Sequence, residues 1–198
     1  MKLIIASNNA HKMREIQEIL GEEFPDMVTL KQAGLAIEVI EDGDTFAANA
    51  IKKAEEVRLF SGYSAALADD SGLIVDALGG APGVYSARYA GEGHNDADNN
   101  AKLMRDMEGV PTEQRTCRFA SAVALAREGK ETICVMGYAE GILLTEARGT
   151  NGFGYDPYFF YPPFGKSFAE LSAEEKNSVS HRKHALEALL NKLRQESK

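Results

Sequence analysis

The chain is poor in several features that mark special classes of protein. It has only two cysteines in 198 residues, Cys117 and Cys134. Both lie in apolar, strand-like runs and lack the close spacing of zinc ligands. We interpret them as buried free thiols, which favours a reducing, cytoplasmic location over a redox or metal-binding pair.

Long apolar runs and blocks of basic residues are missing too. No run approaches the length of a membrane span, and the apolar residues 2–6 are too few for a signal peptide. The formal net charge is −8, so duplex nucleic acid would be repelled. We therefore expect neither membrane nor nucleic acid as a partner. A small anion remains compatible, because a few lysines and a metal ion reverse the charge locally.

What remains is an ordinary globular composition, with 44% hydrophobic and 26% charged residues. Strand–helix units coexist with a hairpin, which predicts an α/β fold with a mixed sheet in one domain, residues 1–198. The expected strands are residues 2–6, 27–30, 37–40 and 64–68, then hairpin arms 115–127 and 131–147; the expected helices begin near residues 12, 45, 95 and 180.

The segment Ala68-Asp69-Asp70-Ser71-Gly72 follows the apolar run 64–68, so the pattern predicts two acids at the end of a strand. Ligands of open α/β sheets bind beyond such ends, and Mg²⁺ prefers carboxylate oxygens. Adjacent strand residues point to opposite faces, so only one acid would face a ligand directly. Glu41, in an acidic turn, is the second candidate ligand. The alternative is a turn whose acids cap the next element.

Three further clusters are candidates for substrate binding. Residues 7–12 join a strand to a helix, where backbone N–H groups attract phosphate, and Lys12 adds charge; the glycines and the Gly-Lys-Ser/Thr ending of a P-loop are missing. Phe153 and Tyr155 could stack on a nucleobase or pack in the core. Lys176 and the segment 180–182 could bind phosphate or a base carbonyl, or form a solvated helix face.

Together these segments resemble the inosine triphosphate pyrophosphatase family, which acts on non-standard purine nucleotides. Five matching segments follow the family's order along nearly the whole chain. They are Ser7-Asn8-Asn9-Ala10-His11-Lys12, Ala68-Asp69-Asp70-Ser71-Gly72-Leu73, Gly79-Gly80-Ala81-Pro82-Gly83-Val84-Tyr85-Ser86-Ala87-Arg88-Tyr89, Phe153-Gly154-Tyr155-Asp156-Pro157 and Glu174-Glu175-Lys176-Asn177-Ser178-Val179-Ser180-His181-Arg182.

The resemblance implies an elongated mixed β-sheet flanked by helices, with two lobes and a cleft between them, in a Mg²⁺-dependent cytoplasmic homodimer. It implies hydrolysis of ITP, dITP and XTP to the monophosphate and pyrophosphate, by attack of water on the α-phosphorus. Glu41 and Asp70 would bind the metal, with Asp69 as a further candidate ligand, and Asp70 would accept the proton, with Asp69 as its rival. The implied substrate contacts are Ser7, Asn8, Asn9, Ala10, His11, Lys12, Ser71, Phe153, Gly154, Tyr155, Asp156, Lys176, His181 and Arg182.

The chain departs from the family pattern at two places. Many members have Thr-Gly-Asn where this chain has Ser7-Asn8-Asn9, and many bacterial members have Glu where this chain has Ala48. The second departure leaves more of the metal binding to Glu41 and Asp70. Two other functions remain open: a Maf-like nucleotide pyrophosphatase with another base preference, and a non-catalytic nucleotide-binding regulator. An interaction module with polar surface clusters is a third.

Overall fold

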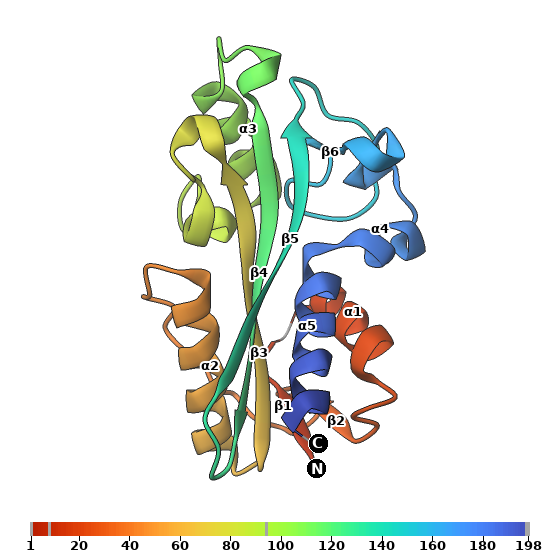
Figure 1. Cartoon of the computed structure of the whole chain (residues 1–198). Helices are drawn as coiled ribbons and strands as arrows, with labels where there is room; N and C mark the ends of the chain where they lie inside the picture. The colour runs from red at the N-terminus through yellow and green to blue at the C-terminus, as the bar shows by residue number, and fades with distance from the viewer. Residues whose placement is uncertain (1, 8, 94, 197–198) are drawn as a thin grey trace. The chain divides into compact units, whose positions relative to one another are not determined.

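The structure, a computed structural model, describes residues 2–7, 9–93 and 95–196, apart from the side chains of Ala10 and His11. In this part of the chain seven strands form one mixed sheet in the order β2-β1-β3-β4-β5-β6-β7, flanked by helices (Figure 1). The strands are β1 Leu3–Ile5, β2 Met27–Thr29, β3 Ala65–Val75, β4 Thr116–Arg127, β5 Ile133–Leu143, β6 Phe159–Tyr161 and β7 Lys166–Ser167.

Five α-helices accompany the described strands, together with short 3₁₀ turns. The helices are α1 Ala10–Leu20, α2 Phe46–Ser61, α3 Asp96–Asp106, α4 Ala173–Val179 and α5 His181–Glu196. Thr45 caps α2 by accepting the Ala48 N–H, and Gly62 ends the helix with a left-handed backbone. No described helix is both long and apolar enough to cross a membrane.

The chain forms two compact units, described separately below. The first consists of Met1–Asp70, Ser121–Gly137 and Arg182–Lys198, and the second of Ser71–Ala120 and Tyr138–His181. Strands β3, β4 and β5 therefore contribute residues to both units. The sheet is mixed because β1 pairs parallel with β2 and β3, whereas β6 pairs antiparallel with β5 and β7.

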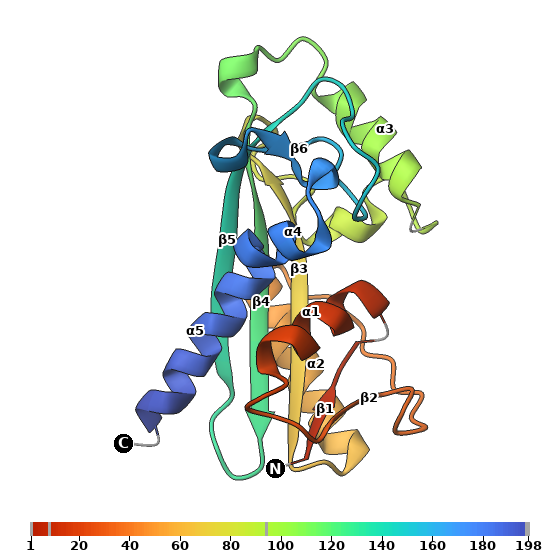
Figure 2. The ribbon, with the colours of Figure 1, turned by 90° about the vertical axis from the view of Figure 1, so that its right-hand side faces the viewer.

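In the first unit, helices cover both faces of the sheet. Helices α1 and α5 lie on one face and α2 on the other, as the two views together show (Figure 2). The apolar side chains of α1 and α5 pack on alternate residues of the strands. This core contains Leu3, Ile5, Met13, Ile16, Leu20, Leu67, Val123, Leu125, Ala185, Leu186 and Leu189.

The second unit has its own core, built around aromatic rings. Phe119 of β4 lies 4.6 Å from Phe159 of β6 and 5.8 Å from Phe168, measured between ring centroids. Helix α3 adds Leu103 to the same cluster. Two capping boxes, predicted by the Ser-x-x-Glu pattern, form at Ser167 and Ser172.

Two sequence expectations about elements need correction. Residues 37–40 are not in a strand. The strand expected at 64–68 continues to Val75, so the two acids lie inside β3 and not at its end. A 3₁₀ turn, Asp76–Leu78, follows the strand. The apolar residues after Gly72 extend the strand, because they are buried against the second unit's core.

The two cysteines are free thiols, as expected. Cys117 is buried in β4, and burial raises the pKa of its thiol to about 12. Burial also raises the pKa of Cys134, which is half-buried in β5. Both thiols are therefore poor nucleophiles at neutral pH.

Candidate active site

The two acids of β3 lie just past the carboxyl end of its neighbour β1. Their register pairs Ile5 with Leu67, and the Ala6 N–H donates to the Leu67 carbonyl at 2.8 Å. Beyond this point β1 has ended and β3 continues through Asp69 and Asp70. The acids therefore occupy the position beyond a strand end where α/β sheets bind ligands, although the strand that ends is β1.

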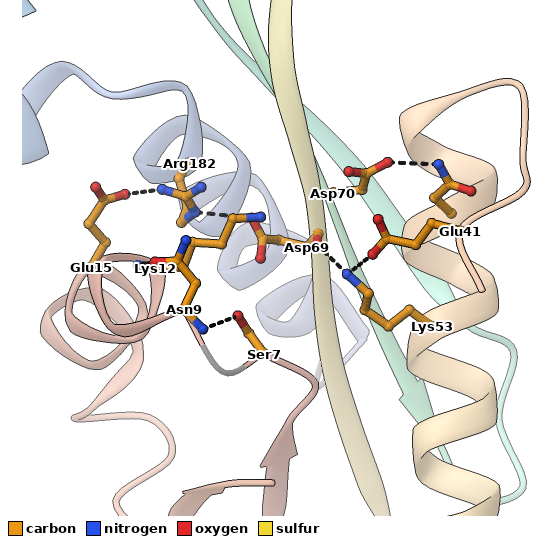
Figure 3. A network of polar contacts seen from close by, with 10 residues as sticks. Ser7, Asn9, Lys12, Glu15, Glu41, Lys53, Asp69, Asp70 and Arg182 are labelled. Atoms are coloured by element: carbon orange, nitrogen blue, oxygen red, sulfur yellow. Dashed lines mark hydrogen bonds and ion pairs between the residues drawn. The ribbon is translucent and has the colours of Figure 1, made fainter. Parts of the chain in front are cut away.

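Asp69 points to the face of β3 that carries α1 and α5 (Figure 3). Its Oδ2 lies 3.0 Å from Lys12 Nζ and 3.2 Å from Arg182 Nε, and the side chain is 1% exposed. Burial by itself would raise the pKa of Asp69. The charges of Lys12, Arg182 and Lys53 outweigh it and hold that pKa well below its usual range. Asp69 is thus a permanently charged partner of two cations.

Arg182 is buried among carboxylates at the start of α5. Its guanidinium pairs with Glu15 of α1 as well as with Asp69, and its side chain is 1% exposed. Lys176 and His181 are also buried, at 6% exposed each. The alternative of a solvated helix face is therefore wrong for these residues.

Asp70 points to the opposite face, toward α2 (Figure 3). Its Oδ2 accepts a hydrogen bond from Asn49 Nδ2 at 2.9 Å, and the residue is 7% exposed. Burial raises the pKa of Asp70; the hydrogen bond from Asn49 opposes this shift, and the negative charge of Glu41 adds to it. Asp70 and Glu41 are therefore close enough to repel each other.

Lys53 of α2 supplies positive charge to this face. Its ammonium pairs with Glu41 and lies 3.4 Å from the backbone carbonyl of Asp69. Lys53 and Asn49 stand four residues apart on α2, so both reach the same strand. Neither residue was expected from the sequence, because α2 carries several other charged side chains and only its packing on β3 distinguishes these two.

The loop before α1 forms a capped helix start. Ser7 Oγ accepts the Asn9 N–H at 3.2 Å, and Asn9 Oδ1 accepts the Lys12 N–H at 3.2 Å. Lys12 then reaches back to Asp69. Asn8 lies outside the described residues, as do the side chains of Ala10 and His11. The described part brings one lysine and a helix N-terminus to the acids of β3, an arrangement suited to phosphate.

In the second unit, Asp156 organises the predicted aromatic segment. It is 2% exposed, and its Oδ2 accepts the Phe153 N–H at 2.9 Å and pairs with Lys176 Nζ at 2.5 Å. The same ammonium lies 4.6 Å from the Phe153 ring centroid. At Gly152, φ is +76° and an added Cβ would come within 2.1 Å of Asp156 Oδ2. The loop therefore requires glycine there.

Some of the other predicted substrate contacts are half-buried and some are fully buried. Tyr155 is 5% exposed and its hydroxyl donates to the Ser86 carbonyl at 2.7 Å, so this ring packs in the core. Burial raises the pKa of Tyr155. Phe153, Gly154 and Ser71 are half-buried. His181 stacks on Phe119, with 5.0 Å between the ring centroids.

Two side chains of helix α3 hold the loop that carries Phe153, through hydrogen bonds to the backbone of that loop. Asp96 Oδ2 accepts the Gly154 N–H at 2.7 Å, and Asn100 Nδ2 donates to the Gly154 carbonyl at 2.8 Å. Gly154 itself has φ +61°. Both polar groups of one residue are thus held from a single helix, which restricts the loop that carries Phe153.

Comparisons with known proteins agree with these features. The Ham1 family model matches residues 3–192. The chain belongs to the Ham1 family. A Clostridium perfringens relative named dITP/XTP pyrophosphatase is 47% identical over 98% of this chain and 97% of its own length. A Desulforamulus reducens relative of the same name is 50% identical, with the same coverage of both chains.

Solved structures of Ham1 proteins share the fold. The Staphylococcus aureus Ham1 protein is 37% identical, has a TM-score of 0.89 and covers 99% of this chain and 100% of its own. A Coxiella burnetii HAM1 protein is 38% identical, with a TM-score of 0.89 over 98% of this chain and 99% of its own. The family and the α/β fold predicted from the sequence are confirmed.

The donor atoms around Glu41 and Asp70 suit a hard divalent cation. The described residues contain no group of three or more His, Cys, Asp or Glu side chains placed to hold a metal. Glu41 and Asp70 lie on the same side of β3, however, and offer carboxylate oxygens of the kind that a divalent cation binds (Figure 3). Mg²⁺ is commonly held by one or two carboxylates together with substrate phosphates and water. The donor atoms of this Ham1 site therefore fit a divalent cation.

Proposed function

We propose that this chain hydrolyses the non-standard purine nucleotides dITP, ITP and XTP to the monophosphate and pyrophosphate, and so cleanses the nucleotide pool. It is a nucleoside triphosphate pyrophosphatase of the Ham1 family. Relatives named dITP/XTP pyrophosphatase, at 47–50% identity over nearly the whole chain, support the substrate class. The match to this family does not favour the Maf-like alternative.

The observation that carries the proposal is the different chemistry of the two faces of β3. On one face Asp69 is neutralised by Lys12 and Arg182. On the other, Asp70 and Glu41 lie near each other, with Lys53 as counter-charge. This second pair is the one we assign to Mg²⁺, which when bound would neutralise phosphate charge.

We assign the triphosphate to the residues around the start of α1. Ser7, Asn8, Asn9, Ala10, His11 and Lys12 hold it by backbone N–H groups and one ammonium. Water attacks the α-phosphorus, the bond from that phosphorus to the bridging oxygen breaks, and pyrophosphate leaves. Asp70 accepts the proton of the water. Asp69 is the weaker candidate for this role, because its carboxylate is already paired with Lys12 and Arg182.

We assign the remaining substrate contacts, as the resemblance implies them, to Phe153, Gly154, Ser71, Asp156, Lys176, His181 and Arg182, with Phe153 against the base; Tyr155, the other implied contact, packs in the core. We propose that hydrogen-bond donors of this set meet the 6-oxo group of hypoxanthine or xanthine in the bound substrate. Adenine presents an amino group there, and an unpaired buried donor costs about 1–3 kcal/mol. Each further mismatch adds to the rejection. We also propose the homodimer and the cytoplasmic location that the resemblance implies.

Product analysis tests the function. Wild-type protein is incubated with dITP and Mg²⁺ in ¹⁸O-labelled water, and the products are separated and their masses measured by mass spectrometry. We expect dIMP and pyrophosphate in equal amounts, with the label in dIMP, because water attacks the α-phosphorus. Inorganic phosphate as the first product, or label in pyrophosphate, would contradict the proposal.

Parallel reactions separate the alternatives. Matched assays with dATP, dGTP, dTTP and UTP should give much lower kcat/KM than dITP and XTP. Preference for dTTP or UTP would favour a Maf-like enzyme. Thermal stabilisation by dITP without any turnover would favour the non-catalytic regulator.

A further inference from the structure

Asn49 connects Asp70 with the turn that carries Glu41, and these are the two carboxylates that we assign to the metal. Asn49 is 1% exposed in the first turn of α2. Its Nδ2 donates to Asp70 Oδ2 at 2.9 Å, and its Oδ1 accepts the Gly43 N–H at 2.7 Å. Gly43 is two residues after Glu41, in the turn that carries this acid. One amide therefore connects the turn of Glu41 with β3.

The two partners allow only one orientation of this amide. A backbone N–H can only donate, and an ionised carboxylate can only accept. The amide oxygen must therefore face Gly43 and the amide nitrogen must face Asp70. Aspartate, leucine or alanine at position 49 cannot make both contacts.

Gly43 independently shows how tightly the amide fits. A Cβ added at position 43 would come within 2.7 Å of Asn49 Oδ1 and 3.0 Å of the Ala48 Cβ. Real Cβ atoms do not approach other atoms so closely, so the side-chain amide would have to move. The absence of a side chain at position 43 thus allows the turn to close on Asn49.

We infer that Asn49 is a positioning residue for the metal site: it fixes the turn of Glu41 relative to Asp70, so that both carboxylates address one divalent cation. Figure 3 shows Glu41 and Asp70 on the same side of β3. Partners that orient metal-binding carboxylates change metal affinity or activity by about 10- to 100-fold when removed. The inference rests on the proposed function, because it takes Glu41 and Asp70 as the metal-binding pair.

The first test measures metal binding without catalysis. Mn²⁺, a paramagnetic substitute for Mg²⁺, is titrated into nucleotide-free protein, and the free ion is counted by electron paramagnetic resonance. Asn49→Leu keeps the volume and the helix and removes both hydrogen bonds. We expect it to weaken Mn²⁺ binding by about 10-fold or more. Gly43→Ala displaces the amide from the other side and should weaken binding in the same direction.

A matched control removes another contact between the same turn and α2. Lys52 Nζ lies 2.6 Å from Asp42 Oδ1, on the exposed surface and outside the site. Lys52→Ala should bind Mn²⁺ within about twofold of wild type, since this exposed pair contributes little. A loss in Lys52→Ala as large as in Asn49→Leu would overturn the inference, because any contact of the turn would then suffice.

Kinetics give a second readout that a purely structural role would not change. At low Mg²⁺ the kcat/KM of Asn49→Leu for dITP should fall, and added Mg²⁺ should restore most of it.

Circular dichroism and the melting temperature report whether the variants fold. If Asn49→Leu does not fold, Gly43→Ala carries the test. Wild-type affinity for Mn²⁺ in both folded variants, or no Mn²⁺ binding by wild type at millimolar concentration, would overturn the inference. Release of pyrophosphate from dITP tests the proposed function separately.

Discussion

Two neighbouring carboxylates can have opposite roles when they lie on one strand. Strand geometry sends Asp69 and Asp70 to opposite faces. On its face Asp69 meets Lys12 and Arg182, which hold its pKa well below the usual range. On the other face Asp70 meets an amide and the charge of Glu41, and burial raises its pKa. The residues on each face therefore favour Asp70 over Asp69 as the base that we propose.

Substitution of each acid by its amide should separate these roles. Asp70→Asn keeps an acceptor for Asn49 and removes a buried charge, so the free energy of unfolding should stay level or rise. Its kcat for dITP should fall by at least about 100-fold, because the proton acceptor is lost. Binding of dITP, measured by calorimetry, should persist.

Asp69→Asn should instead affect the stability of the protein. It leaves Lys12 and Arg182 short of one negative charge in a buried network, which should lower the free energy of unfolding by about 3 kcal/mol. Urea unfolding measures this difference. Near-normal turnover in Asp70→Asn would contradict the assignment of the base, and unchanged stability in Asp69→Asn would contradict the structural role of that acid.

Among the elements, those with a local signal could be predicted from the sequence. The periodic apolar residues of α1, the cap at Thr45 and the two Ser-x-x-Glu boxes depend on near neighbours in the chain, and all are present. The length of β3 depends on tertiary contacts instead. It continues through Asp69 and Asp70 because the residues after them are buried, and burial of that kind leaves no local pattern.

The residues of the candidate site also differ in whether the sequence could reveal them. Asp69, Asp70, Glu41 and Lys12 could be found because charged residues at turns and strand ends stand out. Asn49 and Lys53 could not be singled out by type, because helices of soluble proteins commonly carry both residues. Only the packing of α2 on β3 gives them partners.

The hydrogen bonds from α3 to Gly154 lead to a prediction about how this helix contributes to substrate binding. Asn100→Ala removes the donor to the Gly154 carbonyl and does not weaken the helix, since alanine is the best helix former. A neutral hydrogen bond contributes about 0.5–1.5 kcal/mol, so the KM for dITP should rise about 2- to 10-fold. The kcat should change little, because the loop would contribute to ground-state and transition-state binding alike.

Asp98→Asn is the matched control on the same helix. Asp98 is exposed and belongs to the first turn of α3, so the Asp98→Asn enzyme should have the same KM for dITP as wild type. Steady-state kinetics with dITP measure both variants. A fall in kcat with unchanged KM in Asn100→Ala would place the loop in the chemical step and contradict its assignment to base binding.

At the scale of the whole molecule, the two units are interleaved along the chain. The chain passes from one unit to the other after Asp70, Ala120, Gly137 and His181. Three of these passages occur inside the strands β3, β4 and β5. Neither unit is therefore a continuous segment that could be produced by truncation. Each of these strands contributes residues to both units, so unfolding of one unit would remove part of a strand that the other unit also uses.

This interleaving predicts that the units unfold together, although proteins with two units often unfold in steps. The chain has no tryptophan, so one introduced tryptophan reports on a single unit. Phe24→Trp places the probe in the core of the first unit, and Tyr158→Trp places it against the core of the second. The urea transitions of the two variants, each compared with its own circular dichroism curve, should have midpoints that agree within about 0.2 M. If fluorescence and circular dichroism separated within either variant, one unit would be unfolding first, and the shared strands would not couple the two.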